Sequence, residues 1–352
     1  MLVEIPELDA ADETALQCVE SLAYAHSRGA HYVVATKRAL APFVAALGGR
    51  FAGILNAIAA SYAQSGELRR HLPFRVRVEP RHEAGVQCIS DGDSALFLVP
   101  AGYFVEPSRV SPSRLVCEDN TDATVIAAAA DAHFSRTALT RVGRFALHSF
   151  GGGGSSLADQ YLAHAQLGPA VAVVDSDRDM SDGALGGTAD AVLRAHASSV
   201  EGRNVGRPVV LRVRELENLI PAKVMRDMLT SADSREYQER VEMISRSLIS
   251  ESARYADLKS GIPCSMAALL GLPSCSKCQS RGQRETDCAA IAIQGLGVAF
   301  LQRMAKLVST QTARKVGEAL FSQSIAAWQV DEWKAIAKIV AAFAFAAKPM
   351  RV

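Results

Sequence analysis

The feature that most constrains the fold is a regular alternation of strand-like and helix-like segments between residues 114 and 230. Apolar runs rich in Val and Leu alternate there with Ala-rich, helix-favouring runs, and polar or glycine-containing turns separate them. The strand-like runs are 115–118, 144–150, 170–177 and 208–217, and the helix-like runs are 123–134, 155–167 and 218–229. Strands that alternate with helices predict a parallel sheet with helices on its faces. We therefore expect an α/β domain over residues 111–230.

The segments on either side of this domain have different patterns. Residues 1–110 mix helical patterns with short strand-like runs, which predicts an α+β region whose role the sequence does not reveal. Residues 100–114 are rich in Pro and Ser and break the periodicity, so we expect a linker there. Helical periodicity returns at 236–255, 289–308 and 312–347. Residues 231–352 are therefore expected to be mainly helical.

Bulk composition restricts the class of protein. The chain has 352 residues, 49% of them hydrophobic, and a formal net charge of +1, so any nucleic-acid site must be local. The first residues lack the basic and apolar pattern of a signal peptide. The longest apolar run, residues 339–347, is about half the roughly 20 residues that a spanning helix needs. These observations predict a cytoplasmic protein without a membrane partner, and a buried helix at 339–347.

Carboxylates gather at the ends of two predicted strands. Glu118 ends one strand and Asp122 begins the following helix, while Asp175 and Asp177 end a later strand and Asp179 follows in the loop. The carboxyl ends of parallel strands meet at one edge of a sheet, so we expect these five acids to share a site. Crowded carboxylates repel one another unless protons or cations neutralise them, and oxygen ligands favour Mg²⁺ or Mn²⁺. The sequence thus predicts one or two such ions.

Each motif taken alone also fits a different structure or function. The first could be a strand that ends in a solvated turn. The loop from Asp175 resembles a calcium loop only briefly, because Met180 stands where an EF-hand needs Gly and Gly186 where it needs Glu. A D-x-D after a strand also occurs in nucleotide-sugar transferases, where it holds a metal and a diphosphate.

The order of the motifs carries more information than any one of them. E-x-x-x-D after one strand, a glycine turn after the next and D-x-D after a third resemble the Toprim domain of topoisomerases, bacterial primases and OLD-family nucleases. The match covers residues 114–223, with Asp119 standing where the Toprim pattern has Gly. The resemblance implies a metal-dependent nuclease, with Glu118, Asp175 and Asp177 as catalytic residues, acting on DNA rather than RNA in anti-phage defence. A non-catalytic, Toprim-like regulatory subunit and a nucleotide-sugar transferase are the alternatives.

The resemblance extends to a partner and to a further ligand. OLD-like nucleases are joined to ATPases, and because this sequence contains no G-x-x-x-x-G-K-[ST], an ATPase would have to act in trans. Related nucleases have a Glu-Asn pair after the D-x-D strand, which makes Glu217, followed by Asn218, a further candidate metal ligand. The other reading is that Glu215 and Glu217 cap the helix near Pro221, and Glu215 suits that structural role better.

Phosphate-binding residues are expected beside the metal. The glycine loop contains Gly152, Gly153 and Ser155, and Ser156 with Asp159 fits an S-x-x-D capping box at the start of a helix. Free amides at a helix N-terminus bind anions, so the loop could cradle a phosphate, or it could be a tight turn without a ligand. Lys223 could meet a phosphate or could be a solvated lysine.

Four of the seven cysteines cluster in the C-terminal part. Cys275 and Cys278 form a C-x-x-C motif, with Cys264 upstream and Cys288 downstream. Four thiolates would close a tetrahedral zinc site. Structural Zn²⁺, inert reduced thiols and redox chemistry are the alternatives. The basic residues of this loop could touch nucleic acid if zinc held it in place.

Overall fold

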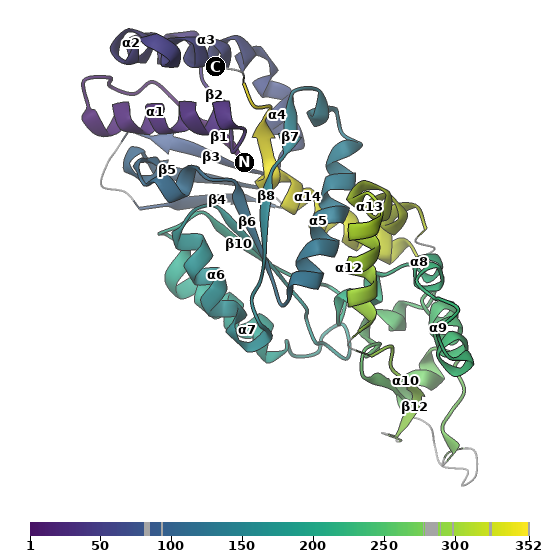
Figure 1. Cartoon of the computed structure of the whole chain (residues 1–352). Coiled ribbons are helices and arrows are strands. Elements are labelled where there is room, and N and C mark those ends of the chain that lie inside the picture. Colours follow the sequence, from purple (N-terminus) through teal and green to yellow (C-terminus); the bar gives the residue numbers. More distant parts are fainter. Residues whose placement is uncertain are drawn as a thin grey trace.

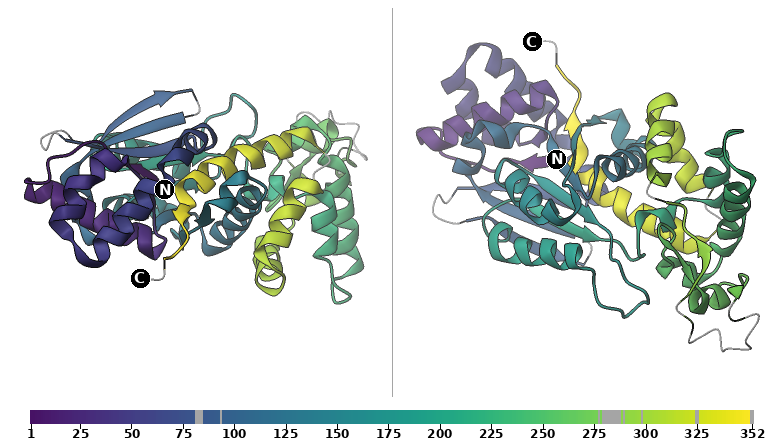
Figure 2. Two further views of the ribbon diagram at one scale, coloured as in Figure 1. Left: turned by 90° about the horizontal axis from the view of Figure 1, so that it is seen from above. Right: turned by 60° about the horizontal axis from the view of Figure 1, so that its bottom comes forward.

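The computed structural model describes residues 1–80, 85–92, 94–276, 278, 288, 290–297, 299–323 and 326–350. It is an α/β structure with parallel-strand sheets, as the sequence predicts (Figure 1). Two larger sheets lie in the N-terminal and middle parts of the chain. The mainly helical C-terminal part extends away from them and returns along a single long helix (Figures 1 and 2).

The middle part contains a four-stranded parallel sheet. Its strands, in the spatial order β10-β9-β6-β8, are β10 (Gly206–Val210), β9 (Ala170–Val174), β6 (Ser113–Cys117) and β8 (Leu147–Gly151). Leu115 and Cys117 face a core that includes helix α5 (Asn120–Ser135). Val116 between them faces a second core with α6 (Leu157–Gln166) and α7 (Gly187–Ala195). Both faces of the sheet are therefore covered, which explains why the central strand β9 is apolar throughout and fully buried.

Three of the four predicted strands are longer than the observed ones, whereas the run 115–118 is shorter than β6. The run 144–150 divides into β7 (Gly143–Phe145) and β8, which join different sheets. The run 208–217 is a strand only as far as Val210, although buried and more exposed residues still alternate from Leu211 to Glu215. Alternation of burial therefore continues for some residues beyond the ladder of backbone hydrogen bonds.

The N-terminal part contains a five-stranded sheet in the order β2-β1-β3-β5-β4. Its strands are β1 (Leu2–Glu4), β2 (Tyr32–Val34), β3 (Phe74–Glu79), β4 (Gln87–Asp91) and β5 (Ser94–Pro100), all parallel to their neighbours except β4. The helices are α1 (Glu13–Arg28), α2 (Lys37–Leu47), α3 (Gly49–Ser61) and α4 (Ser65–His71). The predicted linker is instead packed, because its short 3-10 turns bury Tyr103 and Phe104.

The C-terminal part is mainly helical, and its described residues also include short strands. Its elements are α8 (Ala222–Asp227), α9 (Arg235–Ser247), β11 (Gly261–Pro263), α10 (Cys264–Leu269), β12 (Ile291–Gln294), α12 (Phe300–Thr310), α13 (Ala313–Ser322) and α14 (Ala327–Ala344). The prediction of helix throughout 289–308 is therefore wrong at β12, which pairs with β11.

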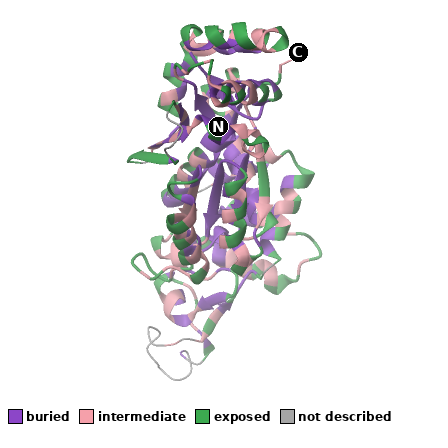
Figure 3. Ribbon diagram, turned by 90° about the vertical axis from the view of Figure 1, so that its left-hand side faces the viewer, coloured by how far each residue is buried: buried purple, intermediate pink, exposed green. Residues whose placement is uncertain are grey.

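Helix α14 returns from this region to the centre of the molecule. It packs against α5 and also contacts β3 and β6, so it joins all three parts of the chain (Figure 2). The chain then forms β13 (Phe345–Ala347), which pairs antiparallel with β7. The predicted buried helix at 339–347 is thus correct up to Ala344 and wrong for the last three residues. One continuous core includes buried residues from all three parts, and Figure 3 shows this burial along the sheets.

Within the described ranges, no helix is both long enough and apolar enough to span a bilayer.

Candidate functional site

The turn after β6 is built by a reciprocal helix cap. The side chain of Asp119 accepts hydrogen bonds from the amides of Thr121 at 2.6 Å and Asp122 at 3.0 Å. The Asp122 carboxylate in turn accepts from the Asp119 amide at 3.4 Å, which completes a capping box at the start of α5. Asp119, which departs from the Toprim pattern, therefore has a local structural role. Asp122 likewise has a capping role in addition to its position in the candidate site.

The glycine loop docks against this turn. The amide of Gly152 donates to Cys117 O at 2.7 Å, and the amides of Gly153 and Gly154 both donate to Glu118 O. A Cβ at Gly151 would lie only 2.4 Å from the backbone nitrogen of the opposing turn, so glycine is needed for this close approach. The loop therefore fixes the backbone that carries Glu118.

This docking does not support the predicted phosphate cradle. The amides of Gly152 and Gly153 already have carbonyl partners, and Ser155 is exposed. The predicted capping box is also wrong, because Ser156 makes no side-chain cap of α6 and its hydroxyl donates instead to Gly152 O. Of the two readings of this loop, the structure favours a tight turn.

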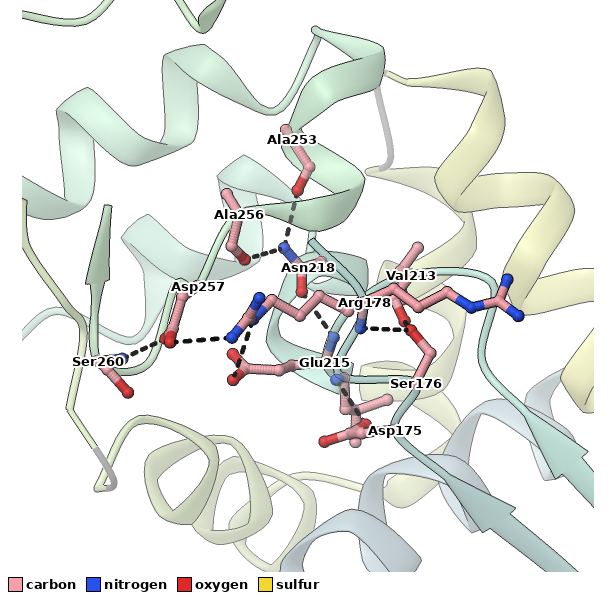
Figure 4. Close-up of polar contacts among 12 residues, drawn as sticks. Asp175, Ser176, Arg178, Val213, Glu215, Asn218, Ala253, Ala256, Asp257 and Ser260 are labelled. Atoms are coloured by element: carbon pink, nitrogen blue, oxygen red, sulfur yellow. Dashed lines mark hydrogen bonds and ion pairs between the residues drawn. The ribbon is translucent and has the colours of Figure 1, made fainter. Parts of the chain in front are cut away.

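The second motif begins where β9 ends. Asp175 Oδ1 accepts a hydrogen bond of 3.0 Å from the amide of Leu216, which ties this strand end to the segment after β10 (Figure 4). The hydroxyl of buried Ser176 donates to Val213 O at 2.6 Å, which is a second tie between the same segments. Both contacts place Asp175 beside the segment that carries Glu215 and Glu217.

Asp177 does not continue the alternation of the strand. Its φ angle is 53°, a left-handed conformation that non-glycine residues seldom adopt. Its amide donates to Arg214 O at 3.0 Å, and its carboxylate lies against Gly186, where a Cβ would have no room. Asp177 is exposed, yet it is close enough to Glu118 for its charge to raise the pKa of Glu118. Strand geometry therefore ends before Asp177, although both Asp175 and Asp177 interact electrostatically with Glu118.

Glu217 lies on a short 3-10 turn, Leu216–Leu219, and Glu215 is the N-cap of this turn. Glu215 and Asn218 form a reciprocal capping box, in which Asn218 Oδ1 accepts from the Glu215 amide at 2.9 Å. The Asn218 side chain also donates to Ala253 O at 2.8 Å and Ala256 O at 2.9 Å (Figure 4). Glu215 is thus the structural acid of the pair, although it caps this turn and not the helix after Pro221.

Helix α14 holds the same turn from the other side. Gln329 Nε2 donates to Asn218 O at 2.8 Å, and Trp333 Nε1 donates to Leu219 O at 2.8 Å. Glu332, also buried, accepts from the Arg212 amide at 2.8 Å. Three contacts from one helix therefore set the position of Glu217, about 110 residues earlier in the chain.

Five acidic side chains and one lysine line a single cleft of about 190 Å³ at the carboxyl ends of β6 and β9. They are Glu118, Asp119, Asp122, Asp175, Glu217 and Lys259. Gly154, Thr121, Leu301 and Gln302 complete the lining. The structure thus brings together Glu118, Asp122, Asp175 and Glu217 of the predicted metal set.

Asp179 and Lys223 lie away from the cleft, and Lys259 lines it although the sequence did not predict this. Asp179 lines a separate surface hollow, together with Glu251 and Tyr255. Lys223 is exposed and bonded to Asp227 at 2.8 Å, so the structure favours its reading as a solvated lysine. Lys259 supplies the cation of the cleft. No sequence motif marks it, because it reaches the cleft from the turn before β11.

Burial and mutual repulsion raise the pKa values of the carboxyl groups in the cleft. Burial, together with the charges of Asp119 and Glu217, raises the pKa of Asp122 to about 8. Burial and the neighbouring acids, Glu118 first among them, raise the pKa of Asp175 well above its usual value. The pKa of Glu118 is raised by burial and by Asp177, and that of Glu217 by burial.

Lys259 offsets only part of this repulsion. Partial burial acts to lower its pKa, but the nearby carboxylates, led by Glu217, raise the pKa of Lys259 overall. One cation therefore faces five acidic side chains across the cleft.

The donor atoms of the cleft suit a hard cation. Glu118 Oε1 is buried and accepts no hydrogen bond from the described residues. This oxygen is therefore available to bind a cation. The carboxylates are nevertheless spread out. Among the described residues, no three acidic side chains have ligand atoms within 4.8 Å of one another. The cleft thus has the ligand chemistry for Mg²⁺ or Mn²⁺, and side-chain rotation would be needed to close a coordination sphere.

The cysteine cluster has the compact geometry that the carboxylates lack. The sulfur atoms of Cys264, Cys275, Cys278 and Cys288 all lie within 4.8 Å of one another, so the four thiols could hold a metal ion. Three of the sulfur–sulfur distances are 3.5, 3.7 and 3.7 Å. A tetrahedral zinc site with Zn–S bonds of about 2.3 Å requires sulfur atoms about 3.8 Å apart. None of the seven cysteines forms a disulfide.

Local backbone contacts bring these cysteines together. The amide of Cys264 donates to Ala290 O at 2.9 Å, and the amide of Ser265 donates to Cys288 O at 3.3 Å, so the β11–β12 pairing brings the outer two cysteines close. The amide of Cys275 donates to Cys264 Sγ at 3.2 Å. The basic residues of the loop, Lys277, Arg281 and Arg284, lie outside the described residues.

Comparison of the chain with protein-family models, curated proteins and solved structures finds no match.

Proposed function

We propose that the carboxylate cleft binds one or two divalent cations and that the protein is a nuclease that hydrolyses phosphodiester bonds. The observation that carries this proposal is the meeting of Glu118, Asp175 and Glu217 in one cleft, with a buried oxygen of Glu118 left without a partner among the described residues. Such crowding destabilises the metal-free protein, and a divalent cation would relieve it.

The residues of the cleft have distinct roles in this proposal. Glu118, Asp175 and Glu217 hold the cation, and Asp122 adds charge while it caps α5. A bound Mg²⁺ or Mn²⁺ would act as a Lewis acid on a phosphoryl oxygen and neutralise the charge that develops there. Lys259 would attract the phosphate backbone to a surface that is otherwise acidic. The resemblance to Toprim nucleases supports DNA as the substrate and phage defence as the biological role.

The test is cleavage of labelled duplex DNA, single-stranded DNA and RNA with Mg²⁺, with Mn²⁺ and with EDTA. Asp175→Asn and Glu217→Gln should each reduce cleavage at least about 100-fold. Asp227→Asn is the matched control, because Asp227 is exposed and pairs with Lys223 away from the cleft. If both cleft variants cleave like the control, the carboxylates are not catalytic.

Two further arms of the experiment address the alternatives. Hydrolysis of a UDP-sugar without nucleic-acid cleavage would favour a transferase. A partner ATPase is also part of the proposal, on the Toprim resemblance, and the product of a neighbouring gene should then co-purify with the chain and stimulate cleavage. A lone chain that cleaves at full rate, unaffected by any partner, would refute that part.

We also propose that the four cysteines hold a structural Zn²⁺. The sulfur–sulfur distances support this, because they approach those of a tetrahedral thiolate site before any ion is placed in it. The ion would link Cys264, at the start of α10, to the cysteines that precede β12, and so stabilise this part of the chain.

A further inference from the structure

A second crevice lies at the carboxyl ends of the N-terminal strands. It has a volume of about 260 Å³, and its lining includes Glu4 at the end of β1, Val34 at the end of β2 and Arg77 on β3. Strand β1 lies between β2 and β3, so the chain crosses from one side of β1 to the other at this point. In open parallel sheets, ligands bind in the crevice outside the strand ends at such a switch point.

Three arginines surround the buried carboxylate of Glu4, and two of them, Arg69 and Arg77, line the crevice. Glu4 is 5% exposed, and Arg69 binds it through two bonds of 2.8 and 3.2 Å. Arg77 Nη2 lies 3.2 Å from Glu4 Oε2, and Arg75 Nε lies 3.5 Å from Glu4 Oε1. A single carboxylate balances one of the three guanidinium charges, which leaves two positive charges in the cluster.

The arginines keep donors free for a ligand. The side chains of Arg69, Arg75 and Arg77 are 34%, 26% and 40% exposed. Each guanidinium has five N–H donors, whereas the carboxylate of Glu4 has room for about four hydrogen bonds in total. Glu4 therefore orients the guanidiniums of Arg69 and Arg77 without filling their donors, and Arg75 adds a third positive charge.

The other acids near the crevice have cationic partners of their own. Glu7, which also lines the crevice, pairs with Arg38 at 3.0 Å. Glu67 on α4 pairs with Arg70 at 2.9 Å. The crevice also includes Thr36, the N-cap of α2, where the helix dipole adds positive potential.

We propose that this crevice binds the phosphate group of a small phosphate-bearing ligand, separate from the carboxylate cleft. Arginine forks match phosphate oxygens in geometry as well as in charge, and here a buried carboxylate holds them in place before a ligand arrives. The volume accommodates a phosphate and a sugar, with any further part of the ligand in solvent. A free nucleotide and the 5′-phosphate of an oligonucleotide share this chemistry.

The test is calorimetric titration of the full chain with inorganic phosphate, pyrophosphate, AMP, and a dinucleotide with either a 5′-phosphate or a 5′-hydroxyl. At least one phosphorylated probe should bind saturably at submillimolar concentration, and the 5′-hydroxyl dinucleotide should not. Preference for AMP or for the 5′-phosphorylated dinucleotide distinguishes the two sources. Arg69→Gln should weaken binding about tenfold or more, since it removes a charge-assisted pair.

Two control variants test whether binding is lost only because a positive charge is removed or because the protein misfolds. Arg70→Gln removes a charge from the same helix at an exposed position and should bind like the wild type. Arg77→Lys keeps the charge beside Glu4 but loses the fork, so it should fold, as its melting curve will show, and still bind about tenfold more weakly. The proposal is overturned if no phosphorylated probe binds the wild type, if Arg70→Gln weakens binding as much as Arg69→Gln, or if folded Arg77→Lys binds normally.

Discussion

Replacing Asp122 with Asn should stabilise the metal-free protein, and increasingly so as the pH rises. Asp122 has a folded-state pKa of about 8, mainly because it is buried, whereas an unfolded Asp titrates near pH 3.9. Between these values the folded state keeps a proton that the unfolded state releases. The free energy of unfolding therefore falls as the pH rises from about 4 to about 8, and is level beyond.

The magnitude follows from the same two pKa values. Each pH unit within the window costs about 1.4 kcal/mol, so at pH 7 the wild type loses up to about 4 kcal/mol through this one group. The neutral Asn side chain carries no such penalty, and its oxygen can still accept the capping bond from the Asp119 amide. The advantage of Asp122→Asn over the wild type should therefore be near zero at pH 4 and grow to a few kcal/mol at pH 7.

The assay is urea unfolding at pH 5, 6, 7 and 8 in EDTA, for the wild type, Asp122→Asn and the exposed control Asp227→Asn. The control should follow the wild type within about 0.5 kcal/mol at each pH. Magnesium should narrow the difference, because it favours ionised carboxylates: at about 100 times its dissociation constant it should add roughly 2.7 kcal/mol to the wild type and less to Asp122→Asn. If the advantage of Asp122→Asn does not grow between pH 5 and pH 8, Asp122 does not titrate as the structure indicates and the reasoning fails.

Three other perturbations test how the sites are held. Trp333→Phe keeps an aromatic ring but removes the indole N–H that donates to buried Leu219 O, so the free energy of unfolding measured with urea should fall by about 1–3 kcal/mol and metal affinity should fall as well; unchanged affinity would show that α14 does not position the metal ligands. Purified protein should contain about one zinc per chain by elemental analysis, and Cys278→Ser should lose it and increase proteolysis of the C-terminal part; a folded, zinc-free wild type would contradict this. Gly151→Ala should destabilise the chain by about 1–3 kcal/mol, because its Cβ would meet backbone at 2.4 Å, whereas Gly187→Ala has no atom within 4 Å and should not.

The sequence alone predicts those parts of the structure that depend on neighbouring residues. The positions of β6, α5, α6 and β9 follow from hydrophobic periodicity, since alternation or a helical repeat states which faces must be buried. The meeting of Glu118 and Asp175 follows as well, because parallel strands end at a common edge. The C-x-x-C pair is likewise local, and it correctly indicates where the thiols gather.

Local patterns could not specify what the backbone does once a strand ends. Period-2 geometry predicts Asp177 on the same side as Asp175, but the chain turns through a left-handed residue to meet Arg214 O. A glycine loop before a helix suggests amides that are free for a ligand, yet those of Gly152 and Gly153 hold the turn after β6. In both cases the deciding partner is a carbonyl group, which every residue has and no sequence motif marks.

Only the tertiary structure decided which distant segments complete the sites. Glu217 is positioned by Gln329 and Trp333 of α14, and Lys259 enters the carboxylate cleft from a turn that the sequence does not single out. The position of Glu217 thus depends on how α14 packs across the molecule, and therefore on the complementarity of whole surfaces. Hydrophobic periodicity predicts that a side chain is buried, but it does not predict which residues the side chain packs against. Long-range partners are therefore decided by packing in three dimensions.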